Sequence, residues 1–149
     1  MTESWDLQVR PRLTAYFAYV AAFLIASVSI ALGVLLKAGS TGVFFRTDDQ
    51  VAIGALGIVI AAAVLLIARP RLRVGQRGIG VRNLVGERII AWAEVVDVSF
   101  PPGARWAHVD LADDEYVQLM AIQAVDKERA VAAMDAVRAL MARYRPNRR

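Results

Sequence analysis

The chain has 149 residues, of which 57% are hydrophobic, a formal net charge of +4 and no cysteine. A chain without cysteine has no disulfide, no thiolate metal site and no cysteine nucleophile. The mean hydropathy of +0.42 is high for a soluble domain, so the arrangement of the apolar residues decides the class of protein. They gather in two long runs in the first half of the chain, whereas the second half reads as an ordinary soluble domain.

Two uncharged apolar runs, at residues 13–36 and 51–68, predict a transmembrane hairpin. A helix needs roughly 20 residues to cross a hydrocarbon core of ~30 Å. The second run has an alternative as a buried core helix, but a domain this small has too little interior to enclose an entirely apolar helix. The first has an alternative as a secretory signal, whose apolar core is typically shorter, at about 7–15 residues. Residues 1–68 are therefore expected to form an N-terminal segment with two spans.

Positive charges predict the orientation of this hairpin, because Lys and Arg near the ends of spans favour the cytoplasmic side. Arg10 and Arg12 precede the first run, and four arginines follow the second: Arg69, Arg71, Arg73 and Arg77. The connection at residues 37–50 carries two basic and two acidic residues. We expect a two-span protein of the plasma membrane with both termini in the cytoplasm.

Small residues recur along both runs, as in Ala18, Ala22 and Ala26, and again in Gly57 and Ala61. Small side chains let helices approach closely within a membrane, so they indicate either packing within the hairpin or a dimerisation face. Trp5, Tyr16 and Tyr19 fit an interfacial aromatic belt. Neither run holds an ionisable residue, which argues against a transporter or channel built from this chain alone.

Residues 69–149 are expected to form a cytoplasmic α+β domain with a basic C-terminal tail. Alternating apolar residues predict strands near residues 79–84, 88–92, 96–100, 107–111 and 117–119. Residues 85–87 and 112–115 have the length of hairpin connections. From Asp126 to Tyr144 the apolar period becomes helical, with Asp126 as the expected N-cap and Pro146 as the stop. The helix would cover one face or opening of an antiparallel sheet.

The stretch from Arg77 to Arg88, followed by Trp92 and Val95–Val96, resembles the bacterial pleckstrin-homology-like (PH-like) domain of small actinobacterial membrane proteins. That group includes the low molecular weight protein antigen 6 family, and two apolar spans ahead of the domain are part of the resemblance. The resemblance covers roughly residues 70–145 and implies a curved sheet closed by the C-terminal helix. It implies no chemistry. The acidic turn Asp113–Glu115 departs from it, since a tighter Asp-Gly turn is expected there.

The sequence offers little for catalysis or cofactor binding. His108 is the only histidine and is expected on the outward face of a strand. Asp110 and the acidic residues 113–115 do not have the spacing of an EF-hand loop. Gly78–Ile79–Gly80 starts like a dinucleotide fingerprint but lacks the third glycine and a βαβ unit. We expect no enzyme activity, no cofactor and no metal.

Basic residues give the best functional indication, because juxtamembrane arginines attract anionic headgroups. The candidate lipid contacts are Arg69, Arg71, Arg73 and Arg77, and the alternative is that these charges only set the topology. A membrane anchor and few clustered aromatics do not fit nucleic-acid binding. The sequence predicts a membrane-anchored binding module that engages a protein partner or anionic lipid. The alternative is an accessory or structural subunit of a membrane complex.

Overall fold

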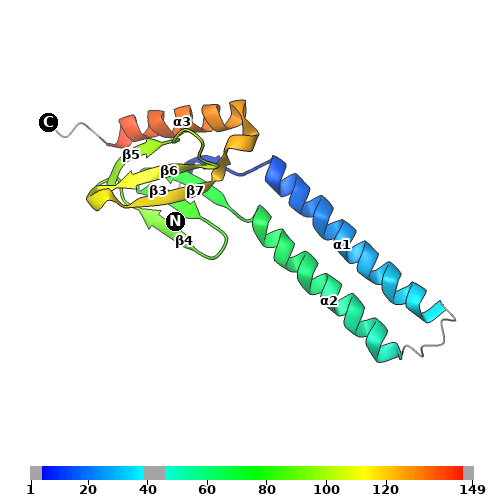
Figure 1. The fold of residues 1–149 in the computed structure, drawn as a ribbon. Helices are drawn as coiled ribbons and strands as arrows, with labels where there is room; N and C mark the ends of the chain where they lie inside the picture. The colour runs from blue at the N-terminus through cyan, green and yellow to red at the C-terminus, as the bar shows by residue number, and fades with distance from the viewer. Residues whose placement is uncertain (1–4, 39–45, 146–149) are drawn as a thin grey trace. The chain divides into compact units, whose positions relative to one another are not determined.

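The structure, a computed structural model, describes residues 5–38 and 46–145, and the chain divides into two compact units. One unit is a helical hairpin made of α1 (Leu13–Ala38), α2 (Thr47–Leu65) and the short 3-10 turn η1 (Leu66–Ala68). The other unit is an α+β domain with seven strands and one long helix (Figure 1). Its strands are β1 (Trp5–Val9), β2 (Arg71–Gly75), β3 (Gly78–Arg82), β4 (Glu87–Ile90), β5 (Val95–Ser99), β6 (Trp106–Leu111) and β7 (Tyr116–Gln123).

Both helices of the hairpin are long and apolar enough to span a membrane, over Leu13–Leu36 and Thr47–Ala68. The second helix, α2, starts at Thr47, four residues before the apolar run. Asp49 in its first turn stabilises this start, because its carboxylate accepts the backbone N–H of the N-cap residue Arg46 at 3.0 Å. Acidic residues in a first turn also suit the positive end of the helix dipole. The large apolar side chains of both helices are mostly exposed, as expected where lipid rather than protein surrounds them.

The small residues of the hairpin lie where α1 and α2 face each other. Gly57 packs so closely on Ser29 that an added Cβ would lie 2.1 Å from the Ser29 hydroxyl oxygen. Ala18, Ala22 and Ala61 are also buried. Of the two interpretations of these residues, the structure therefore supports packing within the hairpin.

The domain holds two antiparallel sheets, one in the order β1-β2-β3-β4 and the other in the order β5-β6-β7. The sequence analysis set residues 1–68 apart from the domain, whereas the structure includes β1 in it. Leu7 pairs with Val74 and Val9 with Leu72. The domain is therefore discontinuous, with the helical hairpin inserted between two neighbouring strands of one sheet.

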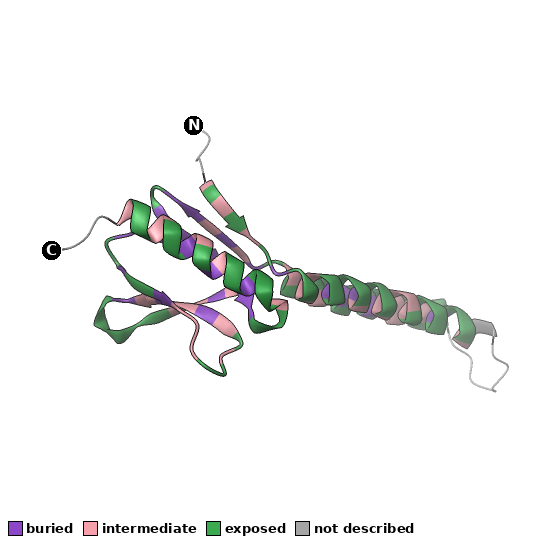
Figure 2. Cartoon of the chain, turned by 90° about the horizontal axis from the view of Figure 1, so that it is seen from above, coloured by how far each residue is buried: buried purple, intermediate pink, exposed green. Residues whose placement is uncertain are grey.

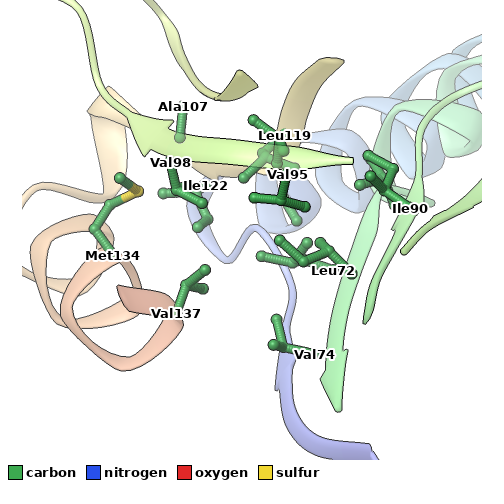
Figure 3. Packing of buried hydrophobic residues seen from close by; sticks show 14 of the residues in the cluster. Leu72, Val74, Ile90, Val95, Val98, Ala107, Leu119, Ile122, Met134 and Val137 are labelled. Carbon is green, nitrogen blue, oxygen red and sulfur yellow. The ribbon is translucent and has the colours of Figure 1, made fainter. Parts of the chain in front are cut away.

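The third helix, α3 (Glu128–Tyr144), packs on the domain core through Ala130, Met134 and Val137. These three buried residues are four and three positions apart and therefore share one face of the helix, on which buried residues are purple in Figure 2. Met134 and Val137 lie beside apolar side chains of both sheets (Figure 3). The large apolar side chains that are fully buried include Leu72, Val74, Ile79, Ile90, Val95, Val98, Val109, Leu119, Ile122 and Val137. The expected arrangement of antiparallel strands covered by a C-terminal helix is confirmed.

The expected N-cap of this helix is wrong. Lys127, with a φ of 45°, occupies the N-cap position, and Asp126 lies in the preceding 3-10 turn η3 (Ala124–Asp126). The Asp126 carboxylate instead accepts the backbone N–H of Leu13 at 3.2 Å. It thus satisfies a donor at the start of α1, which has no partner within its own helix.

Candidate functional site

The four arginines proposed as lipid contacts do not form one cluster. Arg71 and Arg73 alternate with the buried Leu72 and Val74 along β2, so they lie on the outer face of the sheet. Arg77 is in the turn at the far end of β2, about 13 Å or more from Arg71 at ~3.3 Å per residue. Arg69 is exposed just ahead of β2. Only Arg69 and Arg71 therefore lie at the end where the chain enters the domain.

Arg73 has partners within the sheet. Its guanidinium lies 6.0 Å from the centre of the Trp5 ring and 3.8 Å from the Glu87 carboxylate. Trp5 reaches this face because the β1–β2 register shifts between Trp5 and Leu7. The indole then covers Gly80, where an added Cβ would lie 3.3 Å from the ring. The interpretation of Trp5 as part of an aromatic belt is replaced by a packing role on the sheet.

A cavity of about 520 Å³ opens at the end of β1, between the last residues of β7 and the first turns of α3. Arg10 and Arg129 contribute its two cations, and Asp126 contributes one carboxylate, which already accepts the Leu13 N–H. Gln123 adds a side-chain amide that donates to the Met120 carbonyl oxygen at 2.9 Å. The chain passes directly from this cavity into α1. The arrangement provides a net positive, partly polar recess suited to a phosphate-bearing group.

A second cavity of similar size, about 520 Å³, runs along α3 beside the loop after β5. Phe100, Val131 and Met134 provide apolar surface, while Lys127, Asp135 and Arg138 provide charges. Val131 is 61% exposed although it lies on a helix that is packed on its other side. This groove, with its apolar lining, is suited to a protein side chain or helix rather than to an anion.

The residues considered for chemistry have structural roles or are dispersed. His108 stacks on Tyr116 with ring centres 4.7 Å apart. Gly78 and Gly80 lie in β3, and an added Cβ at Gly78 would approach the Ile90 carbonyl oxygen to 2.0 Å. These glycines therefore serve close strand packing, and no helix follows them as a dinucleotide fingerprint requires. Within residues 5–38 and 46–145, no three His, Asp or Glu side chains gather as a metal site would need.

The acidic turn between β6 and β7 forms a tight connection without glycine. Asp113 and Asp114 both have positive φ, at 70° and 57°. Asp tolerates this left-handed region better than most residues, so the two aspartates substitute for the expected Asp-Gly turn. The chain therefore has the expected tight turn at this point and differs from the expectation only in the residues that form it.

Sequence reasoning missed the cavity beside β1. Arg10 was interpreted only as a topology signal, and Arg129 was not singled out. The alternation of Trp5, Leu7 and Val9 is a strand signal, and it would have placed Arg10 at the end of a strand. Nothing in the local sequence, however, indicates that Arg10 and Arg129 lie on the same recess.

The order of strands, the two sheets and the closing helix define a PH-like domain. In agreement with this, residues 69–140 match the family described as Bacterial PH domain. The chain is 67% identical over 143 residues to the proteins named Uncharacterized protein Rv1417 of Mycobacterium tuberculosis and Uncharacterized protein Mb1452 of Mycobacterium bovis. The alignment covers 96% of this chain and 93% of each relative. The chain belongs to the same family as these mycobacterial proteins. No solved structure matches it.

Proposed function

We propose that this protein is a membrane-anchored, non-catalytic binding module whose PH-like domain binds an anionic lipid headgroup at the inner face of the plasma membrane. The observation that carries the proposal is the net positive cavity at Arg10 and Arg129, at the point where the chain leaves the domain for an apolar helix. A headgroup phosphate at the membrane surface would be within reach of such a recess. Arginine is well suited to hold it, because its guanidinium binds phosphate in a bidentate manner.

The strand pairing supports two crossings of the membrane with both ends of the hairpin on one side. Val9 and Leu72 are neighbours in a single sheet, yet α1 and α2 lie between them in the sequence. A sheet cannot form across a bilayer, so both strands must be on the same side. The arginines on either side of the hairpin favour the cytoplasm as that side. We propose that both termini are cytoplasmic.

Of the four arginines first considered, Arg69 and Arg71 are retained as headgroup contacts. They lie next to the membrane-entry end of β2, whereas Arg73 lies nearer the middle of the strand, beside Trp5 and Glu87. Arg77 lies in the turn at the opposite end of the strand. We also propose that the two spans and the domain relate this chain to the low molecular weight protein antigen 6 group.

A second candidate function is attachment to a protein partner, as an accessory subunit of a membrane complex. The apolar groove along α3 favours it, because Val131 and Phe100 offer a site for an aliphatic or aromatic side chain. Crosslinking from the Val131 position in native membranes, followed by mass spectrometry, tests this function. A reproducible crosslinked protein supports it, and recovery of the uncrosslinked chain alone contradicts it.

The headgroup proposal is tested with the full-length protein, because a fragment starting at residue 70 would lack β1. The protein is reconstituted in vesicles of phosphatidylcholine and phosphatidylglycerol, extracted gently, and its retained lipids are counted by native mass spectrometry. The Arg10→Gln/Arg129→Gln variant should lose preference for phosphatidylglycerol. At about 1 kcal/mol per arginine near the surface, the loss is about 2 kcal/mol, or roughly thirtyfold in affinity.

The matched control is Arg77→Gln/Arg143→Gln, which removes two exposed arginines that do not line the cavity. It should retain phosphatidylglycerol like the unmodified protein. An equal loss in both variants would mean that net charge, rather than the cavity, attracts the lipid. No loss in either variant would eliminate the headgroup proposal.

A further inference from the structure

The loop between β3 and β4 presents an apolar tip to solvent. Val85 is fully exposed, at 100%, and its neighbour Leu84 is 37% exposed. No other large apolar side chain in the described part of the domain is as exposed as Val85. A turn of this kind usually carries polar residues or glycine. Two consecutive aliphatic side chains at its tip therefore indicate that the tip contacts an apolar environment.

The base of this loop is fixed to the domain. The Asn83 backbone N–H donates to the Gly86 carbonyl oxygen at 3.0 Å and closes the turn. The Asn83 side chain donates to the Gln118 carbonyl oxygen of β7 at 3.1 Å. The base of the loop is therefore anchored to β7, and Val85 projects from it into solvent.

The tip lies at the end of the sheet where the chain connects to both long helices. β1 ends at Val9 and β2 begins at Arg71, and the antiparallel register pairs Val9 with Leu72 and Arg71 with Arg82. Arg82 is the last residue of β3, so the loop at residues 83–86 follows at that same end. The chain itself thus fixes the tip close to the points at which it enters and leaves the hairpin.

The charges next to the tip complement an anionic surface. Arg71 and Arg82 are direct cross-strand neighbours, and like charges in such a pair repel. Glu87 is the cross-strand neighbour of Arg82, and its carboxylate lies 3.8 Å from the Arg73 guanidinium. Arg71, Arg73 and Arg82 outnumber this one carboxylate, so the four residues carry a net positive charge beside the two aliphatic side chains of the tip. This combination is typical of a surface that enters the headgroup region of a bilayer.

We propose that Leu84 and Val85 insert into the interface of the same bilayer that the hairpin spans, with Arg71 and Arg82 at the lipid phosphates. A narrow tip of two side chains is far too small for a specific protein interface, which buries about 800 Å² per partner. A bilayer requires only an apolar projection with flanking cations. The insertion gives the domain a third attachment, besides the two chain connections, and holds it in one orientation at the membrane. The inference rests on the proposed membrane anchoring, not on headgroup binding in the cavity.

The chain lacks cysteine, so one introduced thiol reports on one position. Val85→Cys and the control Val96→Cys are labelled with an environment-sensitive fluorophore in the full-length protein. Val96 is a matched control because it is also an exposed valine, at 49%, and lines neither cavity. Its carbonyl oxygen accepts a hydrogen bond from Arg145 at the C-terminal end of α3, the end opposite to Asp126. Both variants are reconstituted in nanodiscs of phosphatidylcholine and phosphatidylglycerol, with or without brominated acyl chains.

The label at position 85 should emit at shorter wavelength than the label at position 96. Brominated lipid should quench it about twofold or more, as expected for a group at the headgroup–acyl boundary. Equal emission and equal, weak quenching at both positions would overturn the inference. That result leaves the headgroup proposal standing, since lipid retention through Arg10 and Arg129 is measured separately. Conversely, unchanged phosphatidylglycerol retention in the Arg10→Gln/Arg129→Gln variant, together with a quenched label at position 85, would overturn only the proposal of headgroup binding in the cavity.

Discussion

The contact between Gly57 and Ser29 allows the packing of the hairpin to be tested by enlarging one residue and then reducing the other. In Gly57→Ala, the new Cβ would lie 2.1 Å from the Ser29 hydroxyl oxygen and 2.2 Å from its Cβ. A Cβ in ordinary van der Waals contact lies 3.4–4 Å from its neighbours, more than 1 Å farther than these distances, so α1 and α2 must move apart. Overpacking of a tight contact costs about 1–3 kcal/mol.

The second substitution, Ser29→Gly, removes both clashing atoms. The new Cβ at position 57 would then meet the Cα of residue 29 at 3.7 Å, an ordinary contact. Moving glycine from one helix to the other also keeps the summed helix propensity nearly constant, within about 0.5 kcal/mol. We therefore expect Gly57→Ala/Ser29→Gly to have close to the original stability, with a coupling energy of about 1–3 kcal/mol between the two positions.

The assay is unfolding of the full-length protein in mixed micelles as the mole fraction of a denaturing detergent rises, followed by circular dichroism. The four proteins of the double-mutant cycle give the coupling energy directly. Additive effects of the two substitutions would refute the reasoning. So would a Gly57→Ala protein as stable as the original, because then the two helices do not meet at this point.

Three further substitutions test the domain. Trp92→Phe removes the indole N–H that donates to the Gly75 carbonyl oxygen at 2.9 Å, and the buried acceptor should cost about 2–3 kcal/mol of unfolding free energy in chemical denaturation. Asp114→Gly relieves a positive φ of 57° and should raise the unfolding free energy by about 0.5–1 kcal/mol; a decrease would contradict this. The hydrogen bond from the Tyr144 hydroxyl to Asp6 raises the pKa of Tyr144 above its ordinary value of 10.0. The stability that this bond contributes is therefore complete below that value and is lost as the pH rises through the raised pKa. A stability profile to alkaline pH should show this loss, and Tyr144→Phe should abolish it.

The parts of the fold with a strong local signal could be predicted from the sequence. The two apolar runs, the alternation in β6 and the helical period up to Tyr144 each depend on neighbouring residues alone. The strands β1 and β2 were missed for a different reason. Trp5, Leu7 and Val9 alternate, as do Leu72 and Val74, but the nearby arginines and apolar runs gave stronger signals. Their pairing also joins residues that are 63 to 70 positions apart, such as Val9 with Leu72 and Trp5 with Gly75, and a periodic pattern gives no information on such long-range pairing.

The candidate site shows the same limit. The arginines at 69–77 are adjacent in sequence, but a strand separates them in space and turns Arg73 toward Trp5. Arg10 and Arg129 are distant in sequence, and the closing of α3 against the sheets brings them to one cavity. A run of charged residues in the sequence shows only the local density of charge. It does not predict a charged patch that tertiary packing assembles from distant residues.

The central claim is that a hairpin crossing the membrane twice is inserted between two paired strands on the cytoplasmic side. The most direct test uses single cysteines at three exposed positions, Gln8→Cys in β1, Thr47→Cys at the start of α2 and Gln76→Cys after β2. Intact cells are treated with a membrane-impermeant maleimide before and after lysis. Only the Thr47 variant should react in intact cells, and all three should react after lysis. Reaction of Gln8→Cys without Gln76→Cys in intact cells would contradict the strand pairing, and equal reaction of all three would contradict the two crossings.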